Sequence, residues 1–193
     1  MSDQIPTLPS SPPPPPPSPL VAAAADTERH VGRAGWDQPA RLFALVRTAE
    51  LLRREPAMGE QLRDADPRGF TAVEQEGLPR TADLESMLAR VAWPAEVDGA
   101  ALSVERLVVP PEAERDLPQD PDAAAAQLAG HPGRQDVRLL VAVTREGESI
   151  CLLRQRAHDH DDAVAVGKDI SPGLLHALAL TLEDPGPPAA PAR

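Results

Sequence analysis

The stretch VRLLVAVTREGESICLLRQR, residues 137–156, decides the fold of this chain of 193 residues. It contains two runs rich in Val, Leu and Ile, which are typical of β-strands. Between the runs, Glu146-Gly147 has the composition of a two-residue hairpin turn. We therefore predict that residues 137–145 and 148–156 pair as an antiparallel hairpin.

A two-residue turn also predicts which side chains share a face of the hairpin. On one face, Val143 lies opposite Ile150, and Val141 and Leu139 follow it along the same strand. The other face carries four apolar side chains, namely Leu140, Ala142, Cys151 and Leu153. Because an antiparallel sheet with one solvated face alternates apolar and polar residues, we expect both faces of this hairpin to be covered.

The remaining elements follow from apolar periodicity and from the positions of proline and glycine. We expect helices over residues 20–33, 37–55, 81–93 and 172–182, a strand over 101–109 and a short fourth strand over 163–166. The last helix is apolar around most of its circumference, so it belongs against the sheet. The predicted fold class is α+β: a three- or four-stranded antiparallel sheet packed with N-terminal helices and a C-terminal helix.

Proline marks the parts of the chain that we expect to lie outside this fold. Most of the 24 prolines fall in residues 1–19, 110–135 and 184–193. We predict that 1–19 and 184–193 are disordered tails, because proline-rich segments bury little surface. Residues 20–183 then form a single domain, in which 110–135 is a largely irregular insertion with a short helix.

Composition and charge exclude several classes of function. The formal net charge of -11 repels phosphate backbones, so we expect no nucleic-acid partner. The longest apolar run near the N-terminus, residues 20–25, is too short for a signal peptide or a membrane span, so we expect a cytoplasmic protein without a membrane partner. The single cysteine, Cys151, fits a reducing compartment, and we expect it to be a buried apolar residue.

The sequence contains no complete catalytic motif. It has no Gly-rich phosphate loop, no Gly-x-Ser-x-Gly and no His-Glu-x-x-His, and Gly167-Lys168 lacks the other residues of a Walker A loop. We therefore predict no catalytic residue, and the absence of these motifs favours a protein that is not an enzyme over one of the common enzyme classes, while an uncommon class stays open.

One cluster has the residue types of a metal site, directly after the second strand of the hairpin. If the chain is extended there, His158 and His160 project to the same side, and Asp162 adds a third ligand for zinc or a similar divalent ion. This metal-binding protein or metal-dependent hydrolase is the alternative function. The competing interpretation is a solvated acidic loop that binds no cofactor.

The two tryptophans are the other conspicuous residues. Trp36 and Trp93 each stand at a predicted helix boundary, where an indole ring can anchor the helix to the core. The alternative is that both rings line one ligand cleft.

The leading functional hypothesis is a non-catalytic protein-binding or regulatory module. It rests on the second apolar face of the hairpin, formed by Leu140, Ala142, Cys151 and Leu153. Either helices of the same chain cover this face, or it is an interaction surface for an unidentified protein partner or for self-association.

Three stretches carry a resemblance to a known family. They are GWDQPARLFALVRTAELL (35–52), LARVAWPAEVDGAALSVERLVVPPEAE (88–114) and residues 137–184. These stretches resemble an actinobacterial family of uncharacterised proteins named after a propionibacterial locus. The resemblance covers most of residues 36–184 and leaves out the proline-rich N-terminus. It implies no activity, substrate, cofactor or catalytic residue.

Overall fold

The computed structural model describes residues 16–78, 83–115 and 117–183. Our predictions for residues 1–15 and 184–193 lie outside these ranges. The centre of the structure is a six-stranded sheet with the order β2-β1-β3-β4-β5-β6, in which all neighbours are antiparallel. The strands are β1 (Arg41–Arg47), β2 (Phe70–Glu74), β3 (Gly99–Val108), β4 (Gln135–Thr144), β5 (Ser149–Gln155) and β6 (Ala165–Gly167). The α+β class and the antiparallel sheet are confirmed, and the sheet is larger than the three or four strands predicted.

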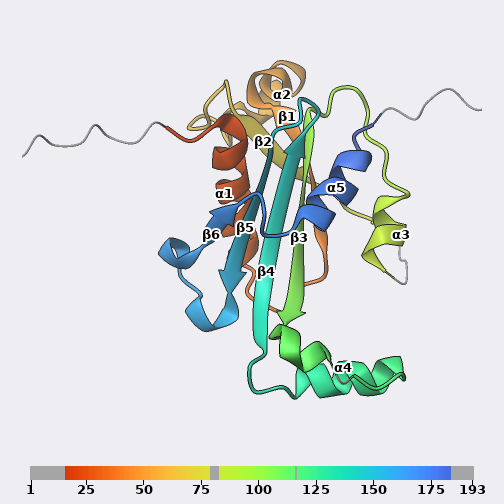
Figure 1. The fold of residues 1–193 in the computed structure, drawn as a ribbon. Coiled ribbons are helices and arrows are strands. Elements are labelled where there is room, and N and C mark those ends of the chain that lie inside the picture. Colours follow the sequence, from red (N-terminus) through yellow and green to blue (C-terminus); the bar gives the residue numbers. More distant parts are fainter. Residues whose placement is uncertain (1–15, 79–82, 116, 184–193) are drawn as a thin grey trace, which may run out of the picture.

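Helices cover both faces of this sheet. They are α1 (Pro19–Gly32), α2 (Thr48–Arg54), α3 (Leu84–Leu88), α4 (Pro121–Ala129) and α5 (Pro172–Leu180). Figure 1 shows α1 on one side of the sheet and α5 with α3 on the other. The core under α1 includes Leu20, Phe43, Leu45, Leu140, Ala142 and Leu152. The core under α3 and α5 includes Leu88, Leu102, Val141, Cys151, Leu175 and Leu178. The chain therefore covers its own sheet.

The hairpin of β4 and β5 forms, but its register differs by one residue from our prediction. Ala142 pairs with Ile150, and Leu140 pairs with Leu152. The turn is longer than expected, because the N–H of Gly147 donates to the carbonyl of Thr144 and Gly147 adopts a φ of 86°. In three-residue hairpin loops the third residue commonly adopts the left-handed conformation, as Gly147 does here. This one-residue shift turns every side chain of β5 to the other face.

The helix predicted over 37–55 is wrong in its first half. Residues 41–47 form strand β1, and the helix α2 begins only at Thr48. Strand β1 lies between β2 and β3 with helices over both faces, so four consecutive residues, 42–45, are buried. A strand buried on both faces does not alternate, and its apolar run also fits a helical period.

The two edge strands are short. We did not predict β2, in which four residues are half-buried and Glu74 is exposed. The predicted strand 163–166 begins two residues before the other edge strand, β6. Helix α3 spans only Leu84–Leu88, which is shorter than the predicted 81–93. Helices α1 and α5 lie where we predicted them.

The insertion forms a tip at the end of the long β3–β4 hairpin, away from the rest of the sheet (Figure 1). Within it, Asp120 caps α4 by accepting a hydrogen bond from the N–H of Ala123 at 2.8 Å. This is the short helix that we predicted. In the described ranges, no helix is long and apolar enough to cross a membrane.

Candidate functional site

The residues of the predicted metal site lie in an exposed loop that is not extended. Two 3₁₀ helices, Arg156–His158 and Asp161–Ala163, form this loop. The Nδ1 atom of His158 lies 3.0 Å from Oε1 of Gln155. Nowhere in residues 16–78, 83–115 and 117–183 does a group of three or more His, Cys, Asp or Glu side chains have an arrangement that could hold a metal ion. A zinc or similar site at His158, His160 and Asp162 stays a prediction.

Two aspartates of the same loop bind an arginine of the sheet. Asp159 and Asp161 both accept hydrogen bonds from the guanidinium of Arg154, at 3.1 and 2.8 Å. Asp159 also accepts from Nε1 of Trp36 at 2.9 Å. The Trp36 hydrogen bond and the Arg154 charge hold the pKa of the Asp159 carboxyl below its usual range. The acidic loop thus binds the protein's own arginine.

A buried ion pair lies behind this loop and joins α1 to the sheet. Glu28 of α1 accepts two hydrogen bonds from Arg154 of β5, each at 2.6 Å. Both residues are at least 97% buried, with exposed fractions of 2% and 3%. The hydrogen bonds from Glu28 raise the pKa of the Arg154 guanidinium.

Arg138 lies beside Arg154, because the two are cross-strand partners. Its Nη2 atom donates to Glu105 at 3.1 Å and to the carbonyl of Gly35, and its guanidinium carbon lies 4.4 Å from the centre of the Trp36 ring. Its Nε and Nη1 atoms are buried without an acceptor in the described part of the chain. The contact with Trp36 is therefore a cation–π interaction that covers a buried charge.

The two tryptophans do not line one cleft. Trp36 covers Arg138, which lies on the α1 face of the sheet. Trp93 packs against the core under α5, and its Nε1 atom donates to Thr181 at 2.9 Å. Because the two rings lie on opposite faces of the sheet, they do not form the ligand cleft that we considered. Each ring packs on its own side of the fold.

The four apolar residues of the predicted interaction surface do not share a face. Leu140 and Ala142 lie in the core under α1, whereas Cys151 and Leu153 lie on the α5 face. The shift of register explains the error. Leu153 is half-buried and the other three are fully buried, so helices of this chain cover them.

Cys151 provides a test of this burial. The side chain is fully buried, and burial raises the pKa of its thiol to about 11. At pH 8 that pKa leaves only about one thiol in a thousand ionised, and the thiolate is the reactive form. We expect folded protein to react with a thiol reagent such as Ellman's reagent at least about a hundredfold more slowly than protein unfolded in urea. Equal rates in the two states would contradict the burial of Cys151.

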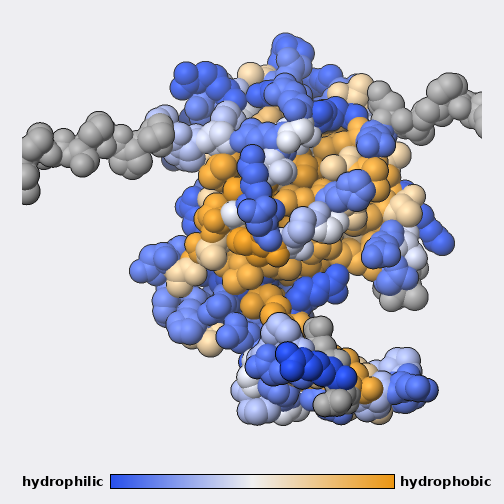
Figure 2. Space-filling view, viewed as in Figure 1, coloured by the Kyte–Doolittle hydropathy of each residue, from blue (hydrophilic) through white to orange (hydrophobic). Residues whose placement is uncertain are grey.

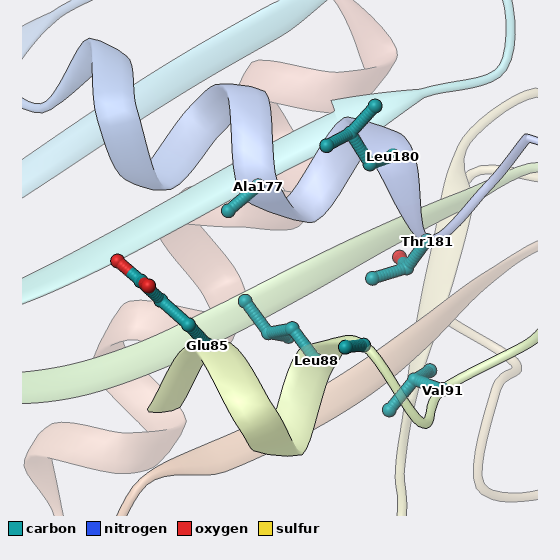
Figure 3. Close-up of a pocket in the computed structure, with 7 residues that line it drawn as sticks. Glu85, Leu88, Val91, Ala177, Leu180 and Thr181 are labelled. Atoms are coloured by element: carbon teal, nitrogen blue, oxygen red, sulfur yellow. The ribbon is translucent and has the colours of Figure 1, made fainter. Parts of the chain in front are cut away.

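Among the described residues, a largely apolar crevice lies between α3 and α5, and we call it the α3–α5 crevice. It has a volume of about 300 Å³, and its lining consists of Glu85, Leu88, Ala89, Val91, Ala177, Leu180 and Thr181. Figure 3 shows Glu85 and Leu88 rising from α3 toward Ala177 on α5, with Leu180 and Thr181 further along the same helix. Leu180 is 49% exposed. Figure 2, which is drawn from the same side as Figure 1, shows hydrophobic residues gathered in the middle of the molecule, with hydrophilic residues above and below them.

The polar groups of the α3–α5 crevice are few. The hydroxyl of Thr181 is occupied, since it accepts from Trp93 and donates to the carbonyl of Leu178 at 2.6 Å. Glu85 is the single charged residue of the lining, and its exposed carboxylate has no ion pair among the described residues. The crevice therefore presents apolar surface with one negative charge at its mouth.

The sequence predicts both helices of this crevice, over residues 81–93 and 172–182, but not the crevice between them. The sequence of α5 did contain a signal for the crevice. Ala177 and Leu180 make the outer side of this helix apolar as well, which is typical of a helix that packs against other elements on several sides.

A comparison with protein families matches residues 20–183 to the PPA1309-like protein family. The chain belongs to this family. The predicted resemblance is thereby confirmed. No curated protein and no solved structure matches the chain. The family assignment adds no catalytic or ligand-binding residue to those described above.

Proposed function

We propose that this PPA1309-like protein is a non-catalytic binding module that works by contact with another protein through the α3–α5 crevice. The observation that carries this proposal is the apolar lining of the crevice, with Leu180 half-exposed beside it. Contiguous apolar surface with a polar border is typical of protein-binding sites.

The shape of the crevice favours a particular kind of partner. A groove between two helices suits an amphipathic helix that inserts apolar side chains at positions i, i+3 or i+4. Glu85 at its mouth, together with the net charge of -11, favours a lysine or arginine next to those apolar residues. We therefore propose a helical, basic partner segment with leucine-sized anchors.

The test uses a display library of helix-forming peptides selected on the folded protein. Selected peptides are expected to share apolar residues at helical spacing and a basic residue. Leu180→Glu is expected to weaken their binding by about tenfold to a hundredfold, because burial of one leucine contributes about 1.5–3 kcal/mol. Isothermal titration calorimetry measures the affinities.

The matched control is His176→Glu, which adds the same charge to an exposed position of α5 outside the crevice lining. It is expected to leave the affinity within about twofold of the original, because surface changes have small effects. Peptides that bind the Leu180→Glu protein as well as the original would refute the α3–α5 crevice as the binding site.

A further inference from the structure

Strand β2 forms one edge of the sheet, and no strand of the described residues pairs with its outer side. The N–H of Thr48 donates to the carbonyl of Gly69, and the N–H of Gln75 donates to the carbonyl of Leu42. These bonds lie at the two ends of the β1–β2 pairing. In an antiparallel pair, alternate residues direct their N–H and C=O groups toward the partner strand. Residues 71 and 73 therefore face β1, and Ala72 directs both groups outward.

Nothing in the described ranges pairs with this outer edge. Strand β2 is the last strand of the sheet order, and no hydrogen bond to the N–H or C=O of Ala72 is found there. An edge of this kind is a template for a further strand.

A groove runs between this edge strand and helix α1, on the face opposite the α3–α5 crevice. We call it the α1–β2 groove. It has a volume of about 490 Å³, and it is lined by Asp26, Thr27 and His30 of α1, by Phe43 and Met58, and by residues 71–74 of β2. Phe43 is buried and Met58 half-buried, so both supply apolar surface to the groove. A strand paired with β2 would direct every second side chain toward this groove.

Polar contacts hold the rim of the groove in place. Arg41 donates to both carboxylate oxygens of Glu74, at 2.6 and 2.5 Å, and its Nη2 atom lies 3.2 Å from Nε2 of His30. Since arginine only donates, Nε2 of His30 is the acceptor in this contact. The His30 ring also stands edge-on to Phe43, with centroids 6.5 Å apart. These contacts join α1, β1 and β2 at the rim of the groove.

We infer that β2 accepts an extended peptide segment of a partner protein as a seventh strand, with an apolar side chain of the peptide in the α1–β2 groove. The outward N–H and C=O of Ala72 supply the main-chain hydrogen bonds, and the groove supplies the specificity, as in other cases of strand addition. The peptide is basic, because it approaches a chain with a net charge of -11. A second copy of this chain carries the same negative charge and fits the edge less well.

The test uses a random nine-residue peptide library displayed on phage and selected on the full chain. The expected sequences alternate apolar residues with lysine or arginine. Nuclear magnetic resonance of the complex is expected to show slower hydrogen exchange at the amide of residue 72, because this amide gains a partner.

Two variants locate the binding. Ala72→Pro removes the outward N–H and is tolerated by an edge strand at a position that faces solvent. We expect it to weaken peptide binding about tenfold, whereas Ala72→Ser, which keeps the N–H, has little effect. Met58→Glu places a charge in the groove and is expected to weaken binding at least as much, so the test does not depend on the proline variant folding.

Three results would overturn the inference. The first is a selection without enriched sequences, and the second is a set of peptides that bind Ala72→Pro and Met58→Glu as well as the original protein. The third is a dimer in light scattering that Ala72→Pro dissociates, since the occupant of β2 would then be a second copy. Leu180→Glu is expected to leave this binding unchanged, which separates the β2 edge from the α3–α5 crevice.

Discussion

Glu28→Ala is expected to lower the free energy of unfolding by about 3 kcal/mol. The change removes the carboxylate that holds Arg154 through two hydrogen bonds of 2.6 Å and leaves a buried guanidinium without its main partner. Breaking a buried ion pair from one side costs about 3–5 kcal/mol. The lower end applies here, because Asp159 and Asp161 still accept from Arg154. Urea unfolding followed by circular dichroism measures the change.

Two further variants separate the buried charge from other causes. Asp26→Ala removes an ion pair of the same helix that is largely exposed, with Asp26 70% accessible, and is expected to cost less than about 1 kcal/mol. The double change Glu28→Leu and Arg154→Met is expected to restore most of the lost stability, because apolar residues of similar size often replace a buried pair without loss. A Glu28→Ala protein as stable as the Asp26→Ala protein would contradict the buried pair.

The local patterns of the sequence predicted a large part of this fold. Strands β4 and β5, helix α1 and helix α5 lie close to their predicted bounds, because each has strong periodicity or clear end signals. The short helix α4 followed from the aspartate and proline at its start. These elements are decided by residues close together in the chain.

The errors arose where distant residues decide the structure. Strand β1 is a strand because β2 and β3 pair with it, and its own residues 41–47 fit a helical period as well. Strand β2 is short and half-buried, so its sequence does not distinguish it from a loop. Without β2 the sequence could not predict the α1–β2 groove.

The largest error at the candidate sites was the register of β4 and β5, and it came from one turn residue. The third residue of the β4–β5 loop, Gly147, shifts the register, so Arg138 and Arg154 face each other across the strands instead of pointing to opposite faces. Their burial beside Glu28 and Trp36 follows from that shift. The sequence predicted His158 and His160 as metal ligands. In the structure, the aspartates that follow them, Asp159 and Asp161, accept hydrogen bonds from Arg154.

Gly99→Ala is expected to lower the free energy of unfolding by about 3 kcal/mol, because β3 and β4 approach too closely at this position to admit a side chain. A Cβ atom on Gly99 would lie 2.5 Å from the carbonyl oxygen of Val143 and 3.3 Å from the Cα atom of Thr144. Both contacts are with the backbone of the neighbouring strand, which cannot turn aside as a flexible side chain can. Overpacking of a well-packed interior costs about 1–3 kcal/mol, and the upper end applies to a backbone contact.

The matched control for Gly99→Ala is Gly59→Ala, in the 3₁₀ helix Pro56–Gly59, where a Cβ atom would meet nothing within 4 Å. That change is expected to be neutral or to stabilise by up to about 1 kcal/mol, because alanine restricts the unfolded chain more than glycine does. Thermal unfolding of the two variants measures the difference, and about 3 kcal/mol in a chain of this size corresponds to several degrees in Tm. Equal Tm values for the two variants would show that β3 and β4 can separate at Gly99, and the close approach would then contribute nothing to the stability of the sheet.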